Sequence, residues 1–268
     1  GYGFTVFNNF PGNKNQISHD DILELAEDKA GNLIIQYRNI PNLFDRLNPI
    51  TYELEKVELT LTNGVSGFVR DLHVNREGEI YILTIQRDGL HVYHFTEEGQ
   101  IIPVITLEEE HRKLTTKASL LSLTDGRFLI NDAEYGVRLF DAQGKLSKVF
   151  KKRDFVGTTK LFPYPNPAFF LHQDKLGKVW FSLYHTSTLF LLDENALNFY
   201  PMERMPQNKY YTQIWEDKLG NLLLGNGNNR KSETSTEGLY YVTLKNEVQN
   251  FSHLRSSGNP ITAAYGQD

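Results

Sequence analysis

The sequence predicts an all-β protein of the β-propeller class, because three features recur together along its 268 residues. A unit of roughly 40–50 residues repeats five times, each copy contains four short runs rich in Val, Ile, Leu, Phe and Tyr, and tight turns separate the runs. Runs of this length and composition favour β-strands. A four-stranded sheet that is apolar on both faces must pack against a similar sheet on each side, as propeller blades do.

The first two runs of each copy flank a turn that closes on glycine. The turn glycines are Gly31, Gly78, Gly126, Gly177 and Gly220. In the turns DKAGN and DKLGN the first residue is an aspartate, Asp28 and Asp217 respectively, whose carboxylate can accept hydrogen bonds from backbone N–H groups. Glycine supplies the left-handed conformation that a tight hairpin needs. Each pair of runs therefore predicts the two inner strands of one antiparallel blade.

A third and a fourth run complete each copy and predict the two outer strands. We expect the innermost strands to begin near Ile22, Val69, Ala118, Ala168 and Thr212. The expected blades span residues 15–60, 64–106, 117–151, 166–203 and 209–253. Residues 1–10 are expected to form the outer strand of a preceding blade, and residues 259–268 the inner strand of a following blade. The chain is thus predicted to hold five near-complete blades plus partial blades at both ends, with no helix longer than about three turns. A row of β-hairpins in a solenoid is the alternative architecture.

Composition excludes several function classes. The 28 Lys and Arg residues against 33 Asp and Glu residues give a net charge of -5, without long runs of either sign, so a nucleic-acid partner is not expected. The chain has no cysteine, which excludes disulfides, thiolate metal sites and cysteine nucleophiles. No run approaches the roughly 18 apolar residues of a membrane span.

The eight histidines form no recognisable catalytic or metal motif. His91 and His94 are three residues apart on an expected strand, so their side chains should face opposite sides of the sheet. His73, His172 and His185 lie in different copies, where convergence on the propeller axis and separate structural roles both stay open. Because HExxH, GxSxG and dinucleotide-binding glycine motifs are also missing, we expect no catalytic residue, no metal and no cofactor.

The loops between the second and third runs should all emerge on one face of the propeller. They place aromatic rings beside guanidinium, carboxylate and amide groups, a combination that suits sugars, because rings stack on C–H faces and polar groups bind hydroxyls. The candidate ligand-binding residues are Tyr37, Arg38, Arg87, Glu134, Tyr135, Tyr184, His185 and Asn228. Loops that are polar only because they meet water are the alternative.

The repeat resembles the two-component regulator propeller repeat, which occurs in the extracytoplasmic sensor regions of hybrid two-component histidine kinases. The best copies are IWEDKLGNLLLG, from Ile214 to Gly225, and LHQDKLGKVWFS, from Leu171 to Ser182. The second of these keeps the tryptophan of the family pattern as Trp180. The other copies have Ile, Tyr or Leu at this position, and similar repeats occur in the virginiamycin B type of lyase.

This resemblance implies that the chain is an extracytoplasmic, ligand-sensing part of a periplasmic sensor anchored in the inner membrane. It implies no enzymatic activity in the chain itself, an oligosaccharide ligand, a homodimer contact, and further blades and downstream domains of the same parent protein as partners. A propeller lyase of the virginiamycin B type and a protein-interaction scaffold stay open as alternative functions. In either case Trp180 and Trp215 are expected to be largely buried, Trp180 between neighbouring blades.

Overall fold

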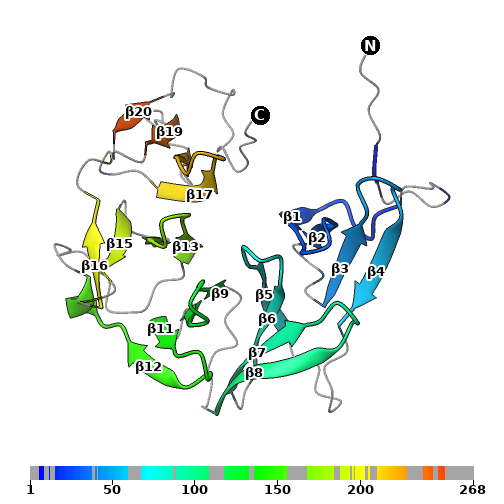
Figure 1. Cartoon of the computed structure of the whole chain (residues 1–268), viewed down its shortest axis with the longest axis horizontal. Helices are drawn as coiled ribbons and strands as arrows, with labels where there is room; N and C mark the ends of the chain where they lie inside the picture. The colour runs from blue at the N-terminus through cyan, green and yellow to red at the C-terminus, as the bar shows by residue number, and fades with distance from the viewer. Residues whose placement is uncertain are drawn as a thin grey trace. The chain divides into compact units, whose positions relative to one another are not determined.

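The computed structural model describes twenty β-strands in five four-stranded antiparallel sheets (Figure 1). The described residues are 6–8, 12, 16–37, 40, 42–59, 68–86, 89–108, 118–132, 136–155, 168–183, 188–193, 195, 197–202, 205, 210–227, 238–243 and 247–250. Within these ranges the single helical element is a 3-10 turn, Lys152–Asp154. The predicted all-β propeller class with four-stranded antiparallel blades is therefore confirmed.

In every blade the strand order follows the chain order, from the inner to the outer edge. Blade 1 contains β1 (Ile22–Glu27), β2 (Leu33–Tyr37), β3 (Leu43–Leu47) and β4 (Leu54–Glu58). Blade 2 contains β5 (Phe68–Val74), β6 (Ile80–Ile85), β7 (Gly89–Phe95) and β8 (Ile101–Glu108). Blade 3 contains β9 (Ala118–Ser122), β10 (Phe128–Asp132), β11 (Gly136–Phe140) and β12 (Leu146–Val149). Blade 4 contains β13 (Ala168–Gln173), β14 (Val179–Leu183), β15 (Leu189–Asp193) and β16 (Asn198–Pro201). Blade 5 contains β17 (Tyr210–Glu216), β18 (Leu222–Gly227), β19 (Gly238–Val242) and β20 (Val248–Asn250).

The inner strands β1, β5, β9, β13 and β17 begin within two residues of the positions expected from the repeat. Of the residues expected to form partial blades at the two ends, only 6–8 are described. In that segment Asn8 forms an isolated parallel bridge with Gln16. The expected terminal half-blades therefore stay predictions.

The chain divides into two compact units, residues 1–116 with 143–145, and residues 117–142 with 146–268. The first unit holds blades 1 and 2, which pack face to face through one apolar cluster. Ile34 and Phe44 from blade 1 belong to this cluster together with Ile80 and Ile82 from blade 2. The ring of Phe44 also meets that of Phe95 edge-on, with centroids 5.5 Å apart.

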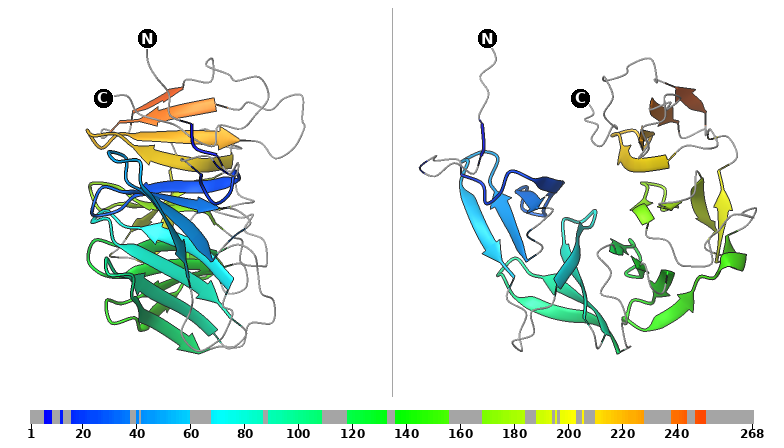
Figure 2. Two further views of the ribbon diagram at one scale, coloured as in Figure 1. Left: turned by 90° about the vertical axis from the view of Figure 1, so that its right-hand side faces the viewer. Right: turned by 180° about the vertical axis from the view of Figure 1, so that it is seen from behind.

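The second unit holds blades 3, 4 and 5, which follow one another in a stack (Figures 1 and 2). One cluster joins Leu129 of blade 3 to Val179 and Phe181 of blade 4. A second cluster joins Trp180 of blade 4 to Leu222 and Leu224 of blade 5. Each blade of this unit thus has an apolar face against its neighbour, which is the burial that a two-faced sheet requires.

The three interfaces share one register relative to the turn glycine. The third residue after that glycine points toward the following blade, as Ile34, Leu129 and Trp180 do. The second and fourth residues point toward the preceding blade, as Ile80 with Ile82, Val179 with Phe181, and Leu222 with Leu224 do. In blades 1, 3 and 4, the repeat position that carries Trp180 is therefore the residue that the second strand inserts into the following blade.

Both predicted tryptophan placements can be assessed. Trp180 is 2% exposed and lies in the cluster between blades 4 and 5, which confirms its expected place. Trp215, on the inner strand β17, is partly buried, with less of its side chain covered than that of Trp180. Within its sheet β17 pairs only with β18, because it is the edge strand, and an edge strand offers fewer neighbours to cover a large side chain.

Gly78 allows the turn of blade 2 to touch the turn of blade 1. Lys29 N donates to Gly78 O at 3.0 Å, and a Cβ on Gly78 would lie 2.1 Å from Lys29 N. Gly31 has the equivalent position in blade 1 and a similar φ, +81° against +76°, but a Cβ there would meet nothing nearer than Glu27 Oε1 at 3.8 Å.

Gly78→Ala is therefore expected to lower the free energy of unfolding by about 2–3 kcal/mol, because it adds a backbone clash to the strain of a positive φ. Gly31→Ala is the matched control, with an expected loss of about 1 kcal/mol from the φ strain alone. Urea unfolding of both variants measures the difference. Equal losses would show that the two turns do not press together in solution.

Candidate functional site

Of the eight residues predicted to bind a ligand, the structure describes Tyr37. The other seven, Arg38, Arg87, Glu134, Tyr135, Tyr184, His185 and Asn228, lie outside the described residues. Tyr37 is the last residue of β2 and its side chain is 1% exposed. Its ring packs with Ile17, Ile35 and Leu47, so in this structure it offers no open face to a ligand.

The hydroxyl of Tyr37 takes part in a buried hydrogen-bond network around Asp45. Tyr37 Oη donates to Asp45 Oδ2 at 2.5 Å, and Ser18 donates to the same carboxylate through its N and its Oγ, each at 2.6 Å. Burial and the adjacent Asp45 carboxylate both raise the pKa of Tyr37. Asp45 is fully buried, and the network fastens Ser18 to β3. Local sequence patterns do not reveal this network, because Ser18 and Asp45 are 27 residues apart.

The aspartates of the β1–β2 type of turn share one geometry in three blades. The Oδ1 atoms of Asp28, Asp174 and Asp217 each accept hydrogen bonds of 2.8–2.9 Å from the backbone N–H groups two and four residues later. Their Oδ2 atoms receive a side-chain donor from farther along the chain, namely Arg46 Nε at 2.6 Å, Trp180 Nε1 at 2.8 Å and Tyr241 Oη at 2.7 Å, respectively. Each carboxylate therefore closes its turn and ties it to another strand. The turn role predicted for Asp28 and Asp217 is confirmed.

These hydrogen bonds make the stability of blade 5 sensitive to acid. Although burial opposes its charge, the hydrogen bonds from Asn221, Tyr241 and the turn backbone lower the pKa of Asp217 from 3.8 to about 2. The unfolded chain therefore binds this proton first as the pH falls, and stability rises with pH in this window. The stabilisation is complete above about pH 4 and is lost as the pH falls toward 2.

Between pH 5 and pH 2.5 we expect the urea midpoint to fall farther for the wild-type chain than for Asp217→Ala. The difference between the two falls is the stabilisation that the ionised Asp217 carboxylate supplies. Other acids titrate in both proteins, so the difference between the two curves isolates Asp217. Parallel curves would show that the Tyr241 and Asn221 hydrogen bonds do not form in solution.

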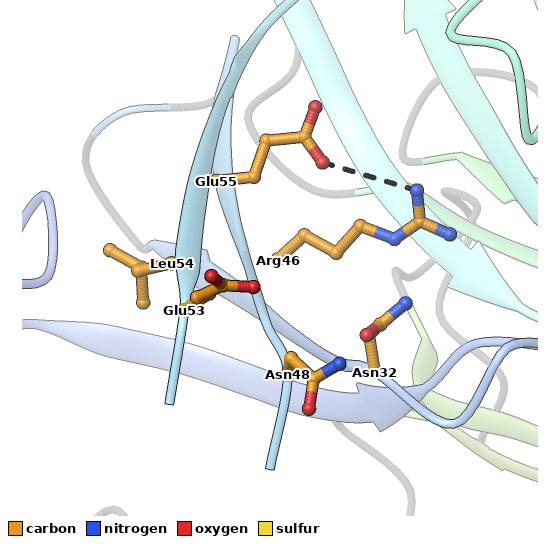
Figure 3. A pocket seen from close by; sticks show the side chains of 6 residues that line it. All are labelled: Asn32, Arg46, Asn48, Glu53, Leu54 and Glu55. Atoms are coloured by element: carbon orange, nitrogen blue, oxygen red, sulfur yellow. Dashed lines mark ion pairs between the residues drawn. The ribbon is translucent and has the colours of Figure 1, made fainter. Parts of the chain in front are cut away.

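Two hollows in the first unit share the side chain of Arg46. One has a volume of about 290 Å³ and is lined by Asn32, Arg46, Asn48, Glu53, Leu54 and Glu55 (Figure 3). The other has a volume of about 400 Å³, lies between blades 1 and 2, and is lined by Asp28, Lys29, Arg46, Gly78, Glu79, Ile80, His94, Phe95, Thr96, Glu97 and Glu98. Both lie at the end of the blades that carries the first turns, opposite the end where the predicted ligand loops begin.

The guanidinium of Arg46 is held in place by its neighbours. Its Nε lies 2.6 Å from Asp28 Oδ2. Its Nη1 lies 4.0 Å from Glu55 Oε2, the ion pair marked in Figure 3. Hydrogen bonds from Asn32, together with the Arg46 charge, hold the pKa of Asp28 below its ordinary value although burial opposes this. Amides, carboxylates and one fixed guanidinium can bind a small hydroxylated molecule. Among the described residues no three His, Asp or Glu side chains gather as metal ligands.

The described histidines occupy separate structural positions. His91 pairs with Thr84 and His94 pairs with Tyr81, so they lie on opposite faces of β7, as predicted. The His94 ring stacks on Tyr81 with centroids 5.1 Å apart. His172 of β13 lies 3.7 Å from Glu216 of β17, where it joins blades 4 and 5. In the part of the chain that is described, no helix has the length and apolar character needed to cross a membrane.

Comparison with known proteins gives a fold and no family. No protein-family profile matches the chain, and no curated protein matches it. Among solved structures, a catalytically inactive virginiamycin B lyase from Staphylococcus aureus, with quinupristin, has a TM-score of 0.62 at 10% identity, covering 91% of this chain and 75% of that one. A protein of unknown function from Bacteroides caccae has a TM-score of 0.62 at 12% identity, covering 92% and 86%.

The extracellular domain of a protein assigned to the hybrid two-component systems of B. thetaiotaomicron also matches. Its TM-score is 0.58 at 17% identity, and the match covers 88% of this chain and 29% of that chain. All these identities are low, so the matches establish only the propeller fold, which this chain shares with the extracellular domain of a two-component system protein and with a lyase.

Proposed function

We propose that this chain is a ligand-sensing propeller module of an extracytoplasmic two-component sensor. The observation that carries the proposal is the Asp174–Trp180 unit of blade 4. The tryptophan of the resembled repeat stands at the third position after Gly177, donates to the turn aspartate at 2.8 Å, and inserts into blade 5. The motif on which the sequence resemblance rests thus connects one blade to the next. An extracellular domain from the hybrid two-component systems is among the proteins with this fold.

The ligand in this proposal is an oligosaccharide bound by the loops that follow the second strands. Arg38, Arg87, Glu134, Tyr135, Tyr184, His185 and Asn228 supply its contacts, with rings for stacking and planar polar groups for hydroxyls. Tyr37 precedes Arg38 in the chain, and its hydrogen bonds with Asp45 and Ser18 hold the end of β2, from which the first of these loops begins. A ligand that touches loops of several blades can favour one arrangement of the blades over another, which is what a sensor requires.

Isothermal titration of the purified chain against pools of plant, host and microbial oligosaccharides tests the proposal. Arg38→Ala and Tyr184→Ala are each expected to weaken binding at least roughly tenfold, a loss of about 1.4 kcal/mol. Tyr37→Phe is expected to reduce stability while the affinity of the folded fraction stays the same. Arg76→Ala, an exposed turn residue at the other end of blade 2, is the matched control and should bind as the wild type does.

Two results would contradict the proposed site. One is undiminished affinity in both loop variants. The other is an affinity that depends on Arg46 instead, because Arg46 lines the hollows at the opposite end of the blades. The second result would be consistent with a sensory function, but the ligand would then bind in the hollows beside the first turns of the blades and not on the loops after the second strands.

A further inference from the structure

A polar side chain recurs at the fifth position after the turn glycine, on the second strand of three blades. The residues are Gln36 in blade 1, Asn131 in blade 3 and Ser182 in blade 4. Their side chains are 5%, 0% and 0% exposed. Each lies two residues beyond Ile34, Leu129 or Trp180, the side chains that enter the following blade, so each faces the same interface one step farther along its strand.

Ser182 shows what a polar group can do at this position. Its Oγ donates to the backbone oxygen of Tyr211 at 2.7 Å. Because Ser182 belongs to β14 and Tyr211 to β17, this bond joins blade 4 directly to blade 5. The two blades are thereby linked by a buried hydrogen bond beside the apolar cluster that they share.

Asn131 occupies the same position between blades 3 and 4, but its side-chain amide makes no hydrogen bond to the described residues of the next blade. Both Oδ1 and Nδ2 are buried, and neither has a hydrogen-bond partner among the described residues. Buried amides are almost always hydrogen-bonded, because an unpaired one has lost its water without a replacement. Blade 2 has Leu83 at this position, fully buried, so the site does not require a polar side chain for packing.

The interface between blades 1 and 2 also contains buried polar atoms that lack a hydrogen-bond partner in the described part of the chain. Gln36 Oε1 is buried without a partner among the described residues, and so is Thr84 Oγ1 on β6. Thr84 lies on the same face of β6 as Ile80 and Ile82, which contact Ile34. Gln36 and Thr84 therefore border one interface from its two sides.

The chemistry of the unpaired atoms restricts what can bind them. Asn131 presents an acceptor and a donor, so a cation would satisfy only Oδ1 and an anion only Nδ2. Gln36 presents an acceptor, while Thr84 presents a hydroxyl that both donates and accepts. A water molecule donates and accepts at once, and buried waters typically make about three hydrogen bonds to such groups.

We propose that internal water molecules bind at Asn131, between blades 3 and 4, and at Gln36 with Thr84, between blades 1 and 2. There they link neighbouring blades as the Ser182 hydroxyl links blades 4 and 5 directly. The residue at the fifth position after the turn glycine thus forms a hydrogen-bonded link to the next blade. In one interface the side chain makes this link directly, and in two others a water molecule completes it.

Oxygen-17 magnetic relaxation dispersion tests this, because it detects water molecules held inside a folded protein. Asn131→Leu and Gln36→Leu are each expected to remove the dispersion amplitude of about one long-lived water. Leu129→Ile and Ile34→Val, two residues earlier on the same strands, are the matched controls and should leave the amplitude unchanged. Amplitude equal to the wild type in both leucine variants would overturn the proposal.

A crystal structure of the wild-type chain gives an independent measurement if a leucine variant does not fold. We expect a water oxygen about 2.7–3.2 Å from Asn131 Nδ2 or Oδ1, and another at the same distance from Gln36 Oε1. Side-chain amides rotated onto protein partners, with no water beside them, would overturn the proposal.

Discussion

Replacement of Trp180 by alanine is expected to lower the free energy of unfolding by about 3–5 kcal/mol. The side chain is 2% exposed and packs with Tyr211, Leu222 and Leu224 of the next blade, so its removal leaves a large cavity in that interface. The change also leaves the turn carboxylate of Asp174, which is 4% exposed, without the 2.8 Å hydrogen bond from Trp180 Nε1. Urea unfolding followed by circular dichroism measures the loss.

Two variants separate the contribution of the packed ring from that of the hydrogen bond to Asp174. Trp180→Phe keeps an aromatic ring and removes the indole donor, so a loss of about 1–2 kcal/mol is expected. Trp215→Ala is the matched control for the removal of a tryptophan, and its loss should be clearly smaller than that of Trp180→Ala because Trp215 is partly exposed. A loss below about 1 kcal/mol for Trp180→Ala would mean that the register of the blades against one another is wrong.

Asp132→Ala is expected to lower the free energy of unfolding by a similar amount, about 3–5 kcal/mol. Asp132 and Arg138 form an ion pair across β10 and β11, and their side chains are 0% and 1% exposed. Without the carboxylate, the guanidinium charge of Arg138 stays in the interior and loses this ion pair. The free energy of unfolding from urea titration gives the loss directly.

The double variant Asp132→Ala with Arg138→Met shows whether the cost comes from the loss of the buried ion pair. Burial of an apolar side chain in place of a buried charge restores stability in other proteins, so the double variant should be more stable than Asp132→Ala alone. If the double variant is less stable than the single one by the full cost of Arg138→Met, the two residues contribute independently and the ion pair is not the cause.

Local features account for what the sequence predicted correctly. The turns at Asp28 and Asp217 are held by hydrogen bonds between residues two and four apart, so composition and spacing reveal them. The strands that flank these turns alternate or run apolar over a few residues, and their starting points were predicted within two residues. The Trp180 position was recognisable because the repeat places it at a constant distance from a turn glycine.

The candidate site was less accessible to sequence. Tyr37 has the composition of a ligand-binding residue, an aromatic ring with a polar end at the start of a loop. The structure buries that ring and binds its hydroxyl to Asp45, eight residues away, and to Ser18 N, nineteen residues away. Nothing in the local sequence distinguishes a tyrosine that faces solvent from one whose hydroxyl has a partner on another strand. Arg46, which lines both hollows, was missed for the same reason, since its partner Asp28 lies on a different turn.

The sequence by itself determined the propeller class, the number of near-complete blades, their inner strands and the role of the turn aspartates. Each of these depends on interactions within one hairpin or on a repeated spacing, which the order of residues contains. Only the tertiary structure decided which residues join one blade to the next: Gly78 against Lys29, Ser182 against Tyr211, and Trp180 inside the interface of blades 4 and 5. Those contacts arise when two sheets pack face to face, and the packing selects partners by shape and by the pairing of buried polar groups. Neither property is visible in one blade alone.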